Sequence, residues 1–298
     1  MSPPAATIPV VLFAHARPAH LARALACLRG NRVPLILAFA DGARSAADAR
    51  GAAESRELLR AVDWCEMRLT ERSANLGLGR NVLGGVTAVA AEFDAFIVWE
   101  DDLVCVPGTY EWMCAALRHY ASDEKVFSVT GWTHPRVAPV AMGNRPYFDG
   151  RAESWSWGAY ARSWRGMNDE TAAEKMARLA ARGISPAIYG ADLPEMAGEE
   201  AARNIWAVRW LYHHLLHDGL CLRPPASLVD HAGFDAAATN AREEDGWRQA
   251  QLPAQAQLPA IWPPVTEDPA CRARWRRAAP GPAVRRWRGW LRRLGWRG

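Results

Sequence analysis

Apolar runs and helically spaced apolar positions alternate along the first 130 residues of the chain. Short continuous apolar runs are typical of buried strands, and apolar residues that recur every three or four positions are typical of amphipathic helices. The pattern predicts strands at residues 8–15, 34–40, 64–69, 95–99 and 126–130. It predicts helices between them, at residues 18–28, 46–62, 79–93 and 109–120. This alternation indicates an α/β fold with a Rossmann-like, mostly parallel sheet flanked by helices, which binds ligands beyond the carboxyl ends of its strands.

The alternation stops after Gly131. An aromatic region interrupted by Gly and Pro follows to about residue 163, and helical patterns return near 169–182 and 199–217. Because 298 residues allow one large domain, we interpret residues 1–250 as a single domain with halves at 1–131 and 132–250. Residues 251–282 are rich in Pro and Gln, a composition that predicts a semi-rigid linker.

The last residues, 283–298, are predicted to form a basic amphipathic helix. Apolar residues recur there at three- and four-residue spacing among arginines, at Val284, Trp287, Trp290, Leu291 and Leu294. The segment from Arg272 to Gly298 holds ten arginines and no acid, whereas residues 1–271 hold 26 basic and 32 acidic residues. Such a helix is typical of proteins that lie on an anionic membrane surface, and its Trp and Leu residues favour lipid over nucleic acid. The alternatives are a helix packed on the body and a disordered tail.

Composition narrows the class of protein further. Half of the residues are hydrophobic and 23% are charged, which excludes an intrinsically disordered chain. The six cysteines contain no C-x-x-C pair, so we expect reduced thiols rather than a disulfide framework or a zinc knuckle. No apolar run reaches the 18 or so residues of a membrane span. We therefore expect a cytoplasmic protein without a signal peptide or transmembrane helix, peripheral on the inner face of the membrane through its tail.

Three adjacent acids, Glu100, Asp101 and Asp102, follow the apolar strand pattern AFIVW. Clustered carboxylates repel one another, and a bound hard cation offsets that repulsion. Mg²⁺ or Mn²⁺ held by one or two carboxylates keeps positions open for diphosphate oxygens. The alternative is a solvated acidic loop that caps the next helix.

Two further places suit a nucleotide. Asp41 ends the second predicted strand, where its carboxylate could accept hydrogen bonds from a nucleotide or belong to an ordinary turn. The segment NLGLGRN at 75–81 brings two glycines and Arg80 to the start of a helix, which suits either an anion or an unliganded helix entry. This segment is neither a Walker loop nor the G-x-G-x-x-G dinucleotide fingerprint.

Eight segments, taken in order, resemble one family. They are PVVLFAHARPAHL, FADG, NLGLGRNV, FIVWEDDLVCVPGTY, FSVTGW, ESWSWGAYARSW, IWAVRW and SLVDHAGFD. From residue 9 to about 240 the chain resembles bacterial glycosyltransferases of the nucleotide-diphospho-sugar transferase (GT-A) fold, especially those similar to N-acetylglucosaminyltransferase I. The resemblance implies a metal-dependent enzyme that moves a sugar from a nucleoside diphosphate, UDP in the first place, to a hydroxyl of a glycan or lipid-linked acceptor, with inversion. Residues 1–131 would bind the nucleotide sugar and residues 132–250 the acceptor.

The resemblance also implies roles for individual residues of the first half. The acidic triplet takes the DxD position, with Asp102 as the primary metal ligand, Asp101 assisting it and Glu100 nearer the ribose. Asp41 would lie near the uracil or the ribose. The two arginines that would lie near the nucleotide are Arg17 and Arg80.

Four residues of the second half have both a functional and a structural interpretation. Trp155 and Trp157 could stack on an acceptor sugar or pack in the core. Arg209 could reach the donor phosphate or form an ion pair in the core. His231 could complete the metal shell, contact the diphosphate or be structural.

One residue departs from the family pattern. Where relatives are expected to carry an acid shortly before IWAVRW, this chain has Asn204, which cannot take a proton from the acceptor. We therefore expect Glu199 or Glu200 to be the general base, although acids at the start of a helix also complement its dipole. Two other functions stay open. One is a nucleotide-sugar or glycan binding module without catalysis; the other is nucleotidyl transfer to a sugar phosphate, which would favour a basic Gly-rich loop in place of AHARPAH.

Overall fold

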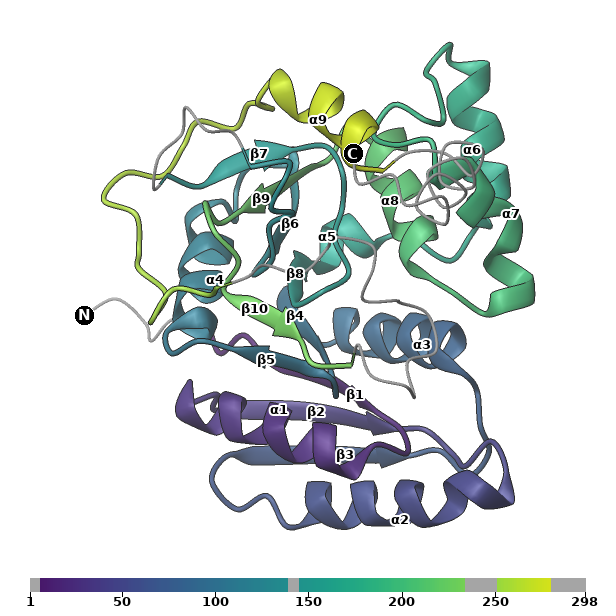
Figure 1. Ribbon diagram of the computed structural model, residues 1–298, viewed down its shortest axis with the longest axis vertical. Helices are drawn as coiled ribbons and strands as arrows, with labels where there is room; N and C mark the ends of the chain where they lie inside the picture. The colour runs from purple at the N-terminus through teal and green to yellow at the C-terminus, as the bar shows by residue number, and fades with distance from the viewer. Residues whose placement is uncertain (1–5, 139–144, 234–250, 280–298) are drawn as a thin grey trace, which may run out of the picture.

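The computed structural model describes residues 6–138, 145–233 and 251–279. These residues form an eight-stranded sheet in the order β3-β2-β1-β4-β8-β6-β9-β7 and a separate ribbon of β5 and β10 (Figure 1). The strands are β1 (Val10–Ala14), β2 (Leu35–Ala40), β3 (Glu66–Glu71), β4 (Ala95–Glu100), β5 (Leu103–Cys105), β6 (Val126–Thr130), β7 (Tyr147–Asp149), β8 (Trp157–Tyr160), β9 (Leu220–Arg223) and β10 (Val229–His231).

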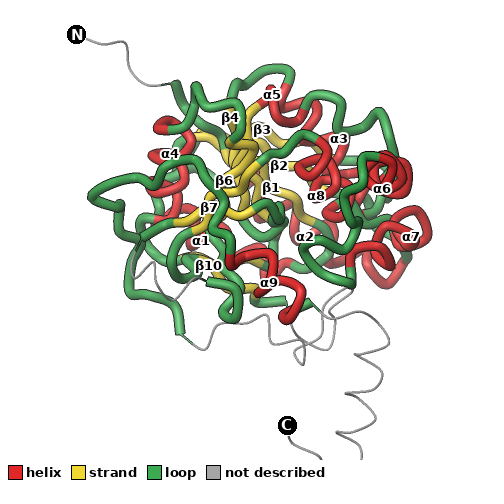
Figure 2. The backbone as a smooth tube through the Cα atoms, turned by 90° about the horizontal axis from the view of Figure 1, so that it is seen from above, coloured by secondary structure: helices red, strands yellow, loops and turns green. Residues whose placement is uncertain are grey.

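Helices surround the sheet. Figure 2, turned by 90° from Figure 1, shows the strands at the centre and helices around them. Three of the helices, α6, α7 and α8, pack on one another at the upper right of Figure 1. The described helices are α1 (Pro18–Gly30), α2 (Ala46–Arg60), α3 (Leu78–Ala90), α4 (Thr109–His119), α5 (Ala161–Trp164), α6 (Ala172–Ala181), α7 (Leu193–Arg203), α8 (Ala207–Leu216) and α9 (Ala270–Ala278).

The burial of each strand follows from its residues. β1 (VVLFA) and β2 (LILAFA) are apolar throughout, and all their residues are buried, as expected for parallel strands covered on both faces. β3 (EMRLTE) lies at the edge of the sheet and alternates exposed with partly exposed residues. Charged side chains on an edge strand discourage pairing with another chain.

β8 joins the two halves of the chain in one sheet. It pairs antiparallel with β4, where Val98 lies opposite Trp157, and antiparallel with β6, where Thr130 lies opposite Trp157. β8 therefore begins at the edge of the sheet where β4 and β6 end. The backbone N–H of Gly131, just after β6, donates to the carbonyl of Ser156 at 2.8 Å. The loop before β8 thus lies beside the carboxyl ends of its two neighbours.

The predicted fold class is confirmed, because the described residues form an α/β fold with a mostly parallel, mixed sheet and flanking helices. The strands and helices predicted for residues 8–130 are present, with ends shifted by three residues at most. The single helix predicted at 199–217 is wrong. Its pattern is divided between α7 and α8 because Asn204 takes the left-handed backbone conformation, with φ at 49°, and ends α7. Asparagine visits this conformation more readily than most residues.

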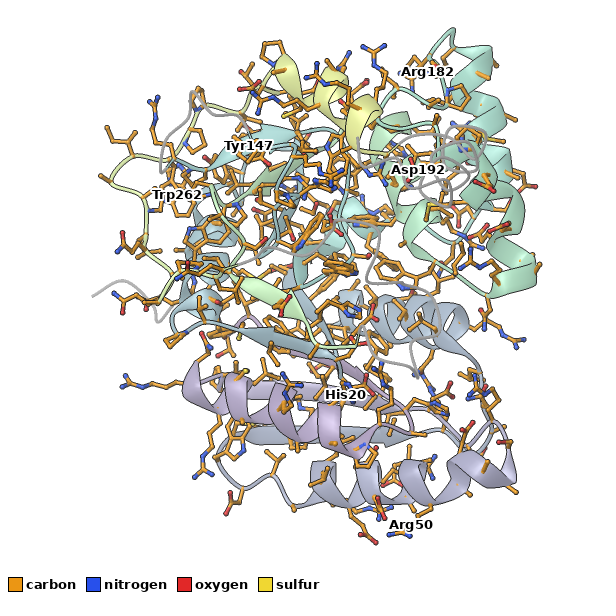
Figure 3. The ribbon with its side chains drawn as sticks, viewed as in Figure 1. His20, Arg50, Tyr147, Arg182, Asp192 and Trp262 are labelled. Carbon is orange, nitrogen blue, oxygen red and sulfur yellow. The ribbon has the colours of Figure 1, made fainter. Side chains whose placement is uncertain are left out.

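The linker predicted at 251–282 is also wrong for its described part. Residues 251–279 run back along the body: the N–H of Ala256 donates to the carbonyl of Pro107, and the hydroxyl of Tyr120 donates to that of Pro263. Trp262, labelled in Figure 3, packs against Trp112, with ring centroids 5.8 Å apart. The segment ends in α9, which buries two apolar side chains, Cys271 and Trp275. The Pro- and Gln-rich composition hid these scattered anchors.

Two other predictions concern membranes. None of the helices that the structure describes is both long enough and apolar enough to span a bilayer. The basic amphipathic helix predicted at 283–298 lies outside the described residues.

Candidate active site at the carboxyl edge of the sheet

The carboxyl ends of β1, β2 and β4 bring the predicted site residues of the first half to one edge. Parallel pairing sets Phe13 beside Glu100 and Ala14 beside Ala40. The residues that follow these strands are therefore neighbours. They are His15 to Arg17 after β1, Asp41 after β2, and Asp101 and Asp102 after β4.

Asp102 is the centre of this group. Its Oδ2 accepts a hydrogen bond from Nη1 of Arg17 at 2.7 Å, and Nε2 of His231 lies 3.5 Å from the same oxygen. β10 brings His231 there because it pairs antiparallel with β5, with His231 opposite Leu103. The other oxygen, Oδ1, is buried and has no hydrogen-bond partner among the described residues. A buried carboxylate oxygen without a partner is costly unless a ligand satisfies it.

Burial and mutual repulsion act on the two preceding acids. Burial raises the pKa of Asp101 to about 7, and the charge of Asp102 adds to this, although the N–H of His15 donates to Oδ2 of Asp101 at 3.0 Å and opposes the shift. The pKa of Glu100 is raised for the same two reasons, burial first and then the charges of Asp102 and Asp101. A nearby cation would lower the cost of ionising all three carboxylates.

Gly233 closes the backbone over Asp102. A Cβ atom at this position would lie 2.4 Å from Oδ2 of Asp102 and 2.8 Å from Nη2 of Arg17. The N–H of Ala232 donates to the carbonyl of Asp102 at 2.7 Å, which fixes the segment. A side chain at position 233 would therefore displace the side chains of Asp102 and Arg17, a closeness that the DHAG pattern did not reveal.

The donor set fits a divalent cation that takes few ligands from the protein. No group of three or more His, Cys, Asp or Glu side chains that could hold a metal is found among the described residues. A cation that binds one or two carboxylates and completes its shell with phosphate and water needs no such group. The buried, unpartnered Oδ1 of Asp102 is an oxygen ligand of the required type.

His231 faces Asp102 as a hydrogen-bond donor. The N–H of Gly233 donates to its Nδ1 at 3.2 Å, so in the neutral ring the proton lies on Nε2, toward Asp102. Burial lowers the pKa of the ring, against the opposing charge of Asp102. In this tautomer Nε2 presents a proton toward Asp102, and the predicted place of His231 in the metal shell or at the diphosphate stays a prediction.

Asp41 anchors the loop before α3. Its Oδ1 accepts the N–H groups of Gly42 and Leu76, both at 2.9 Å, and its Oδ2 accepts those of Gly77 at 2.9 Å and of the Asn75 side chain at 3.1 Å. A carboxylate has about four acceptor positions, and all four are used. Asp41 thus holds the 75–79 loop in place, and its predicted contact with the base or ribose stays a prediction.

The same loop is held from the other side by Asn204. Its Nδ2 donates to the carbonyl of Leu76 at 3.0 Å, its Oδ1 accepts the N–H of Arg80 at 3.2 Å, and its carbonyl accepts the N–H of Gly79 at 2.9 Å. The sequence showed Asn204 only as a missing acid. The exposed side chain of Arg80 turns back on its own loop, with Nε donating to the carbonyl of Leu76 at 3.0 Å.

The two predicted acceptor tryptophans differ in burial. Trp157 is fully buried against Trp206 and Trp210, so its predicted acceptor role is wrong. Trp155 is half-buried and lies at the site: its ring centroid is 4.8 Å from that of His231 and 4.9 Å from that of Trp132. Only Trp155 stays a candidate for contact with a sugar.

The acids predicted as general base lie in α7, away from these contacts. Glu200 is buried, with Oε2 accepting the N–H of Ala172 at 2.7 Å and Oε1 accepting Nε of Arg209 at 2.5 Å. Both oxygens of Glu200 are thus used in the fold and Arg209 is in an ion pair with it, while the predicted base and phosphate roles of the two residues stay predictions. Glu199 is exposed and pairs with Arg203 one turn away at 2.8 Å. No hydrogen bond or ion pair joins either acid to the triplet within the described part of the chain.

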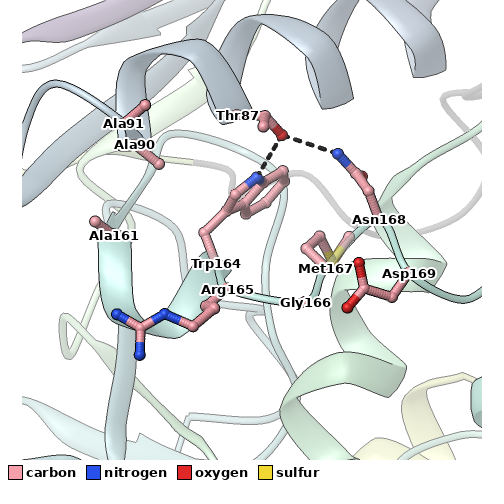
Figure 4. A pocket seen from close by; sticks show the side chains of 10 residues that line it. All are labelled: Thr87, Ala90, Ala91, Ala161, Trp164, Arg165, Gly166, Met167, Asn168 and Asp169. Atoms are coloured by element: carbon pink, nitrogen blue, oxygen red, sulfur yellow. Dashed lines mark hydrogen bonds between the residues drawn. The ribbon is translucent and has the colours of Figure 1, made fainter.

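A pocket of about 310 Å³ lies elsewhere, between α3 and α5 (Figure 4). The hydroxyl of Thr87 accepts hydrogen bonds from Nε1 of Trp164 at 2.9 Å and from Nδ2 of Asn168 at 2.8 Å, as the dashed lines show. Three alanines form much of the remaining wall. This pocket shares no residue with the carboxyl-edge site, and the polar groups of Thr87, Trp164 and Asn168 are paired with one another.

Comparisons with known proteins give structural likenesses. No protein-family model matches the chain, and no curated protein matches it. The chain is similar to a mannosyltransferase of Pyrobaculum calidifontis in complex with GDP-mannose and Mn²⁺, with a TM-score of 0.37 and 12% identity over 58% of this chain and 46% of that one. It is also similar to residues 1–349 of TarS from S. aureus, with a TM-score of 0.38 and 12% identity over 54% of this chain and 49% of that one. The chain thus spans about half the length of each of these structures.

Proposed function

We propose that the chain is a glycosyltransferase of the GT-A fold that uses a divalent cation and a nucleoside-diphosphate sugar, a UDP-sugar in the first place. The observation that carries the proposal is the unpartnered, buried oxygen of Asp102 beside the guanidinium of Arg17. A diphosphate that chelates a cation matches both groups, because the cation takes the carboxylate oxygen and the guanidinium pairs with phosphate oxygens. The order of the eight resembling segments supports the same function.

Each group at the edge has a task in this proposal. When bound, Mn²⁺ or Mg²⁺ would neutralise charge on the departing diphosphate. Asp102 would hold the cation, Arg17 would bind a phosphate oxygen, and the Nε2–H of His231 would donate to another. The half-buried ring of Trp155 would stack on the apolar face of a sugar. These groups would orient the donor before the acceptor arrives.

The acceptor in this proposal is a hydroxyl of a glycan or of a lipid-linked molecule at an anionic membrane. With both oxygens of Glu200 engaged, Glu199 is the remaining predicted base, because its carboxylate is open to solvent. The variant Glu199→Gln should keep donor binding and lose transfer. Turnover near that of the unaltered chain would exclude Glu199.

A thermal-shift screen tests the proposal. Nucleoside diphosphates and their sugars are added with MnCl₂ or with EDTA, since a ligand that binds only the native state raises the melting temperature. We expect stabilisation by one nucleoside diphosphate that needs Mn²⁺ and is absent in Asp102→Asn. No stabilisation by any of them, or equal stabilisation in EDTA, would contradict the proposal.

Two outcomes would favour the rival functions. A nucleotidyltransferase would be stabilised by a nucleoside triphosphate together with a sugar phosphate. A binding module would bind the nucleotide sugar yet neither transfer nor hydrolyse it over long incubation. Donor hydrolysis followed by release of the free diphosphate separates this last case from an enzyme.

A further inference from the structure

Arg17 is held where it neutralises Asp102. Its carbonyl accepts the N–H groups of His20 at 3.1 Å and Leu21 at 3.0 Å, which fixes it at the first turn of α1. Its Nη1 donates to Asp102 at 2.7 Å, and Nε2 of His20, labelled in Figure 3, lies 3.2 Å from its Nη2. The backbone of Arg17 is thus fixed by the start of α1, and its guanidinium lies between Asp102 and His20.

The ion pair is sheltered from water. The Arg17 side chain is 24% exposed and that of Asp102 only 10%. The tight backbone at Gly233 covers Oδ2 of Asp102, and Oδ1 is buried although it has no partner within the described residues. The negative charge of Asp102 is therefore already balanced by Arg17, and both of its oxygens are sheltered, before a cation arrives. Screening by solvent is weak at such a place, so the positive guanidinium opposes a second positive charge strongly.

We propose that Arg17 competes with the divalent cation for Asp102, so that the cation binds tightly only after a diphosphate has drawn the guanidinium away. This inference rests on the proposed function for the identity of the anion. Phosphate oxygens are good partners for a guanidinium, because two parallel N–H···O hydrogen bonds can form. Arg17 therefore gains a partner when it releases Asp102, and the cation meets a carboxylate whose charge Arg17 no longer balances. Binding of cation and diphosphate becomes mutually reinforcing.

Binding of Mn²⁺ alone, without nucleotide, tests the competition. Free Mn²⁺ is followed by electron paramagnetic resonance during titration of the full chain and of Arg17→Gln. We expect Arg17→Gln to bind Mn²⁺ at least about tenfold more tightly, since a contact charge in a poorly screened place is worth at least a decade in affinity. The double variant Arg17→Gln with Asp102→Asn should lose this gain.

Two control variants separate the effect of the Arg17 charge from general effects of charge and of side-chain shape. Arg23→Gln removes the same charge from an exposed position of the same helix and should leave Mn²⁺ affinity unchanged. Arg17→Met keeps the aliphatic stem without the charge and should behave as Arg17→Gln does. Unchanged or weaker Mn²⁺ binding in both Arg17 variants would overturn the competition, and so would an equal gain in Arg23→Gln.

Failure of this inference is distinguishable from failure of the proposed function. If both Arg17 variants gain Mn²⁺ affinity while no nucleoside diphosphate binds, the competition stands and the glycosyltransferase does not. If Mn²⁺-dependent binding of a diphosphate is found in the unaltered chain but Mn²⁺ alone binds all variants alike, the function stands and Arg17 is only a phosphate ligand.

Discussion

At residue 204 an amide does what a carboxylate could not. Its Nδ2 donates to one carbonyl of the 75–79 loop while its Oδ1 accepts an N–H from the next turn. An aspartate has no N–H to donate and would set a negative oxygen against the carbonyl of Leu76. Asn204 therefore has a structural use in this chain, because it keeps two distant segments together.

Asn204→Asp tests this use. We expect it to lower the free energy of unfolding by about 1 kcal/mol, because one hydrogen bond is lost and a negative oxygen is set against the carbonyl of Leu76. Chemical denaturation measures the change. The control is Gln255→Glu, an equal change of charge at an exposed position, which should cost less than about 0.5 kcal/mol. Equal stability of Asn204→Asp and the unaltered chain would show that the amide is dispensable.

The sequence predicted at which edge of the sheet a residue lies better than it predicted the hydrogen-bond partners of that residue's side chain. Arg17 and Asp102 follow apolar strands, and parallel strands end at one edge, so their meeting could be foreseen. The partners of Asp41 lie up to 36 residues away and those of Glu200 up to 28 residues away. No local pattern shows such contacts, so these acids looked available for substrate when they are used by the fold.

Among the elements, α3 depends most visibly on its glycines. A Cβ at Gly79 would lie 2.6 Å from the carbonyl oxygen of Asn204, which is backbone and cannot move aside easily. Gly84 lies later in the same helix and has open space where a Cβ would be. One glycine is thus required by the contact with α7, and the other only weakens the helix.

Two alanine substitutions on α3 should therefore act in opposite directions. Gly84→Ala should raise the free energy of unfolding by about 0.5–1 kcal/mol, the difference in helix propensity. Gly79→Ala should lower it, because the added methyl group pushes the loop away from Asn204. Denaturation of both variants under one condition measures the pair. A shift of the same sign in both would refute the tight contact.

A buried histidine on α8 predicts sensitivity to acid. Burial lowers the pKa of His213 to about 3, and the charges of Lys175 and His217 add to this; Nδ1 lies 3.4 Å from Nζ of Lys175. Below pH 6.5 the unfolded chain binds a proton here that the folded chain refuses. The free energy of unfolding should therefore fall by about 1.4 kcal/mol per pH unit from this group between pH 6 and pH 4.

Denaturation at pH 7.5 and pH 5 checks the acid sensitivity. His213→Gln keeps a donor for the carbonyl of Ser163, which Nε2 of His213 contacts at 3.1 Å, and should lose less stability on acidification than the unaltered chain. His119→Gln changes an exposed ring and should leave the acid response as it is. An unaltered acid response in His213→Gln would assign the effect to other groups.

For the whole molecule, α9 is packed into the body of the protein. Trp275 is fully buried: its Nε1 donates to Oδ2 of Asp149 at 3.0 Å, and the guanidinium of Arg151 lies 4.4 Å from its ring centroid. Arg223, also fully buried, donates to the same Asp149 at 2.6 Å. The composition of 251–282 predicted a spacer because a few anchors among many Pro and Gln residues leave no periodic signal. A cut before Trp275 would expose this group.

The tail prediction is therefore tested with a chain that ends at Ala279. Co-sedimentation with anionic liposomes compares it with the full chain, because attraction of about 1 kcal/mol per arginine would bind the basic tail to such a surface. We expect the full chain to pellet at low salt and the shortened chain to stay in solution. Neutral liposomes serve as the control. Equal pelleting of both chains, or none, would contradict a membrane-binding tail.

The place of β8 in the sheet also determines when, during synthesis, β4 can pair on both of its sides. β4 is complete when residue 100 has been made, yet its second neighbour is made only at residues 157–160, after β6. A nascent chain of intermediate length therefore carries β4 with one side unpaired, and an unpaired strand edge recruits other chains. We therefore expect nascent chains that end within residues 101–156 to aggregate more readily than chains that already contain β8.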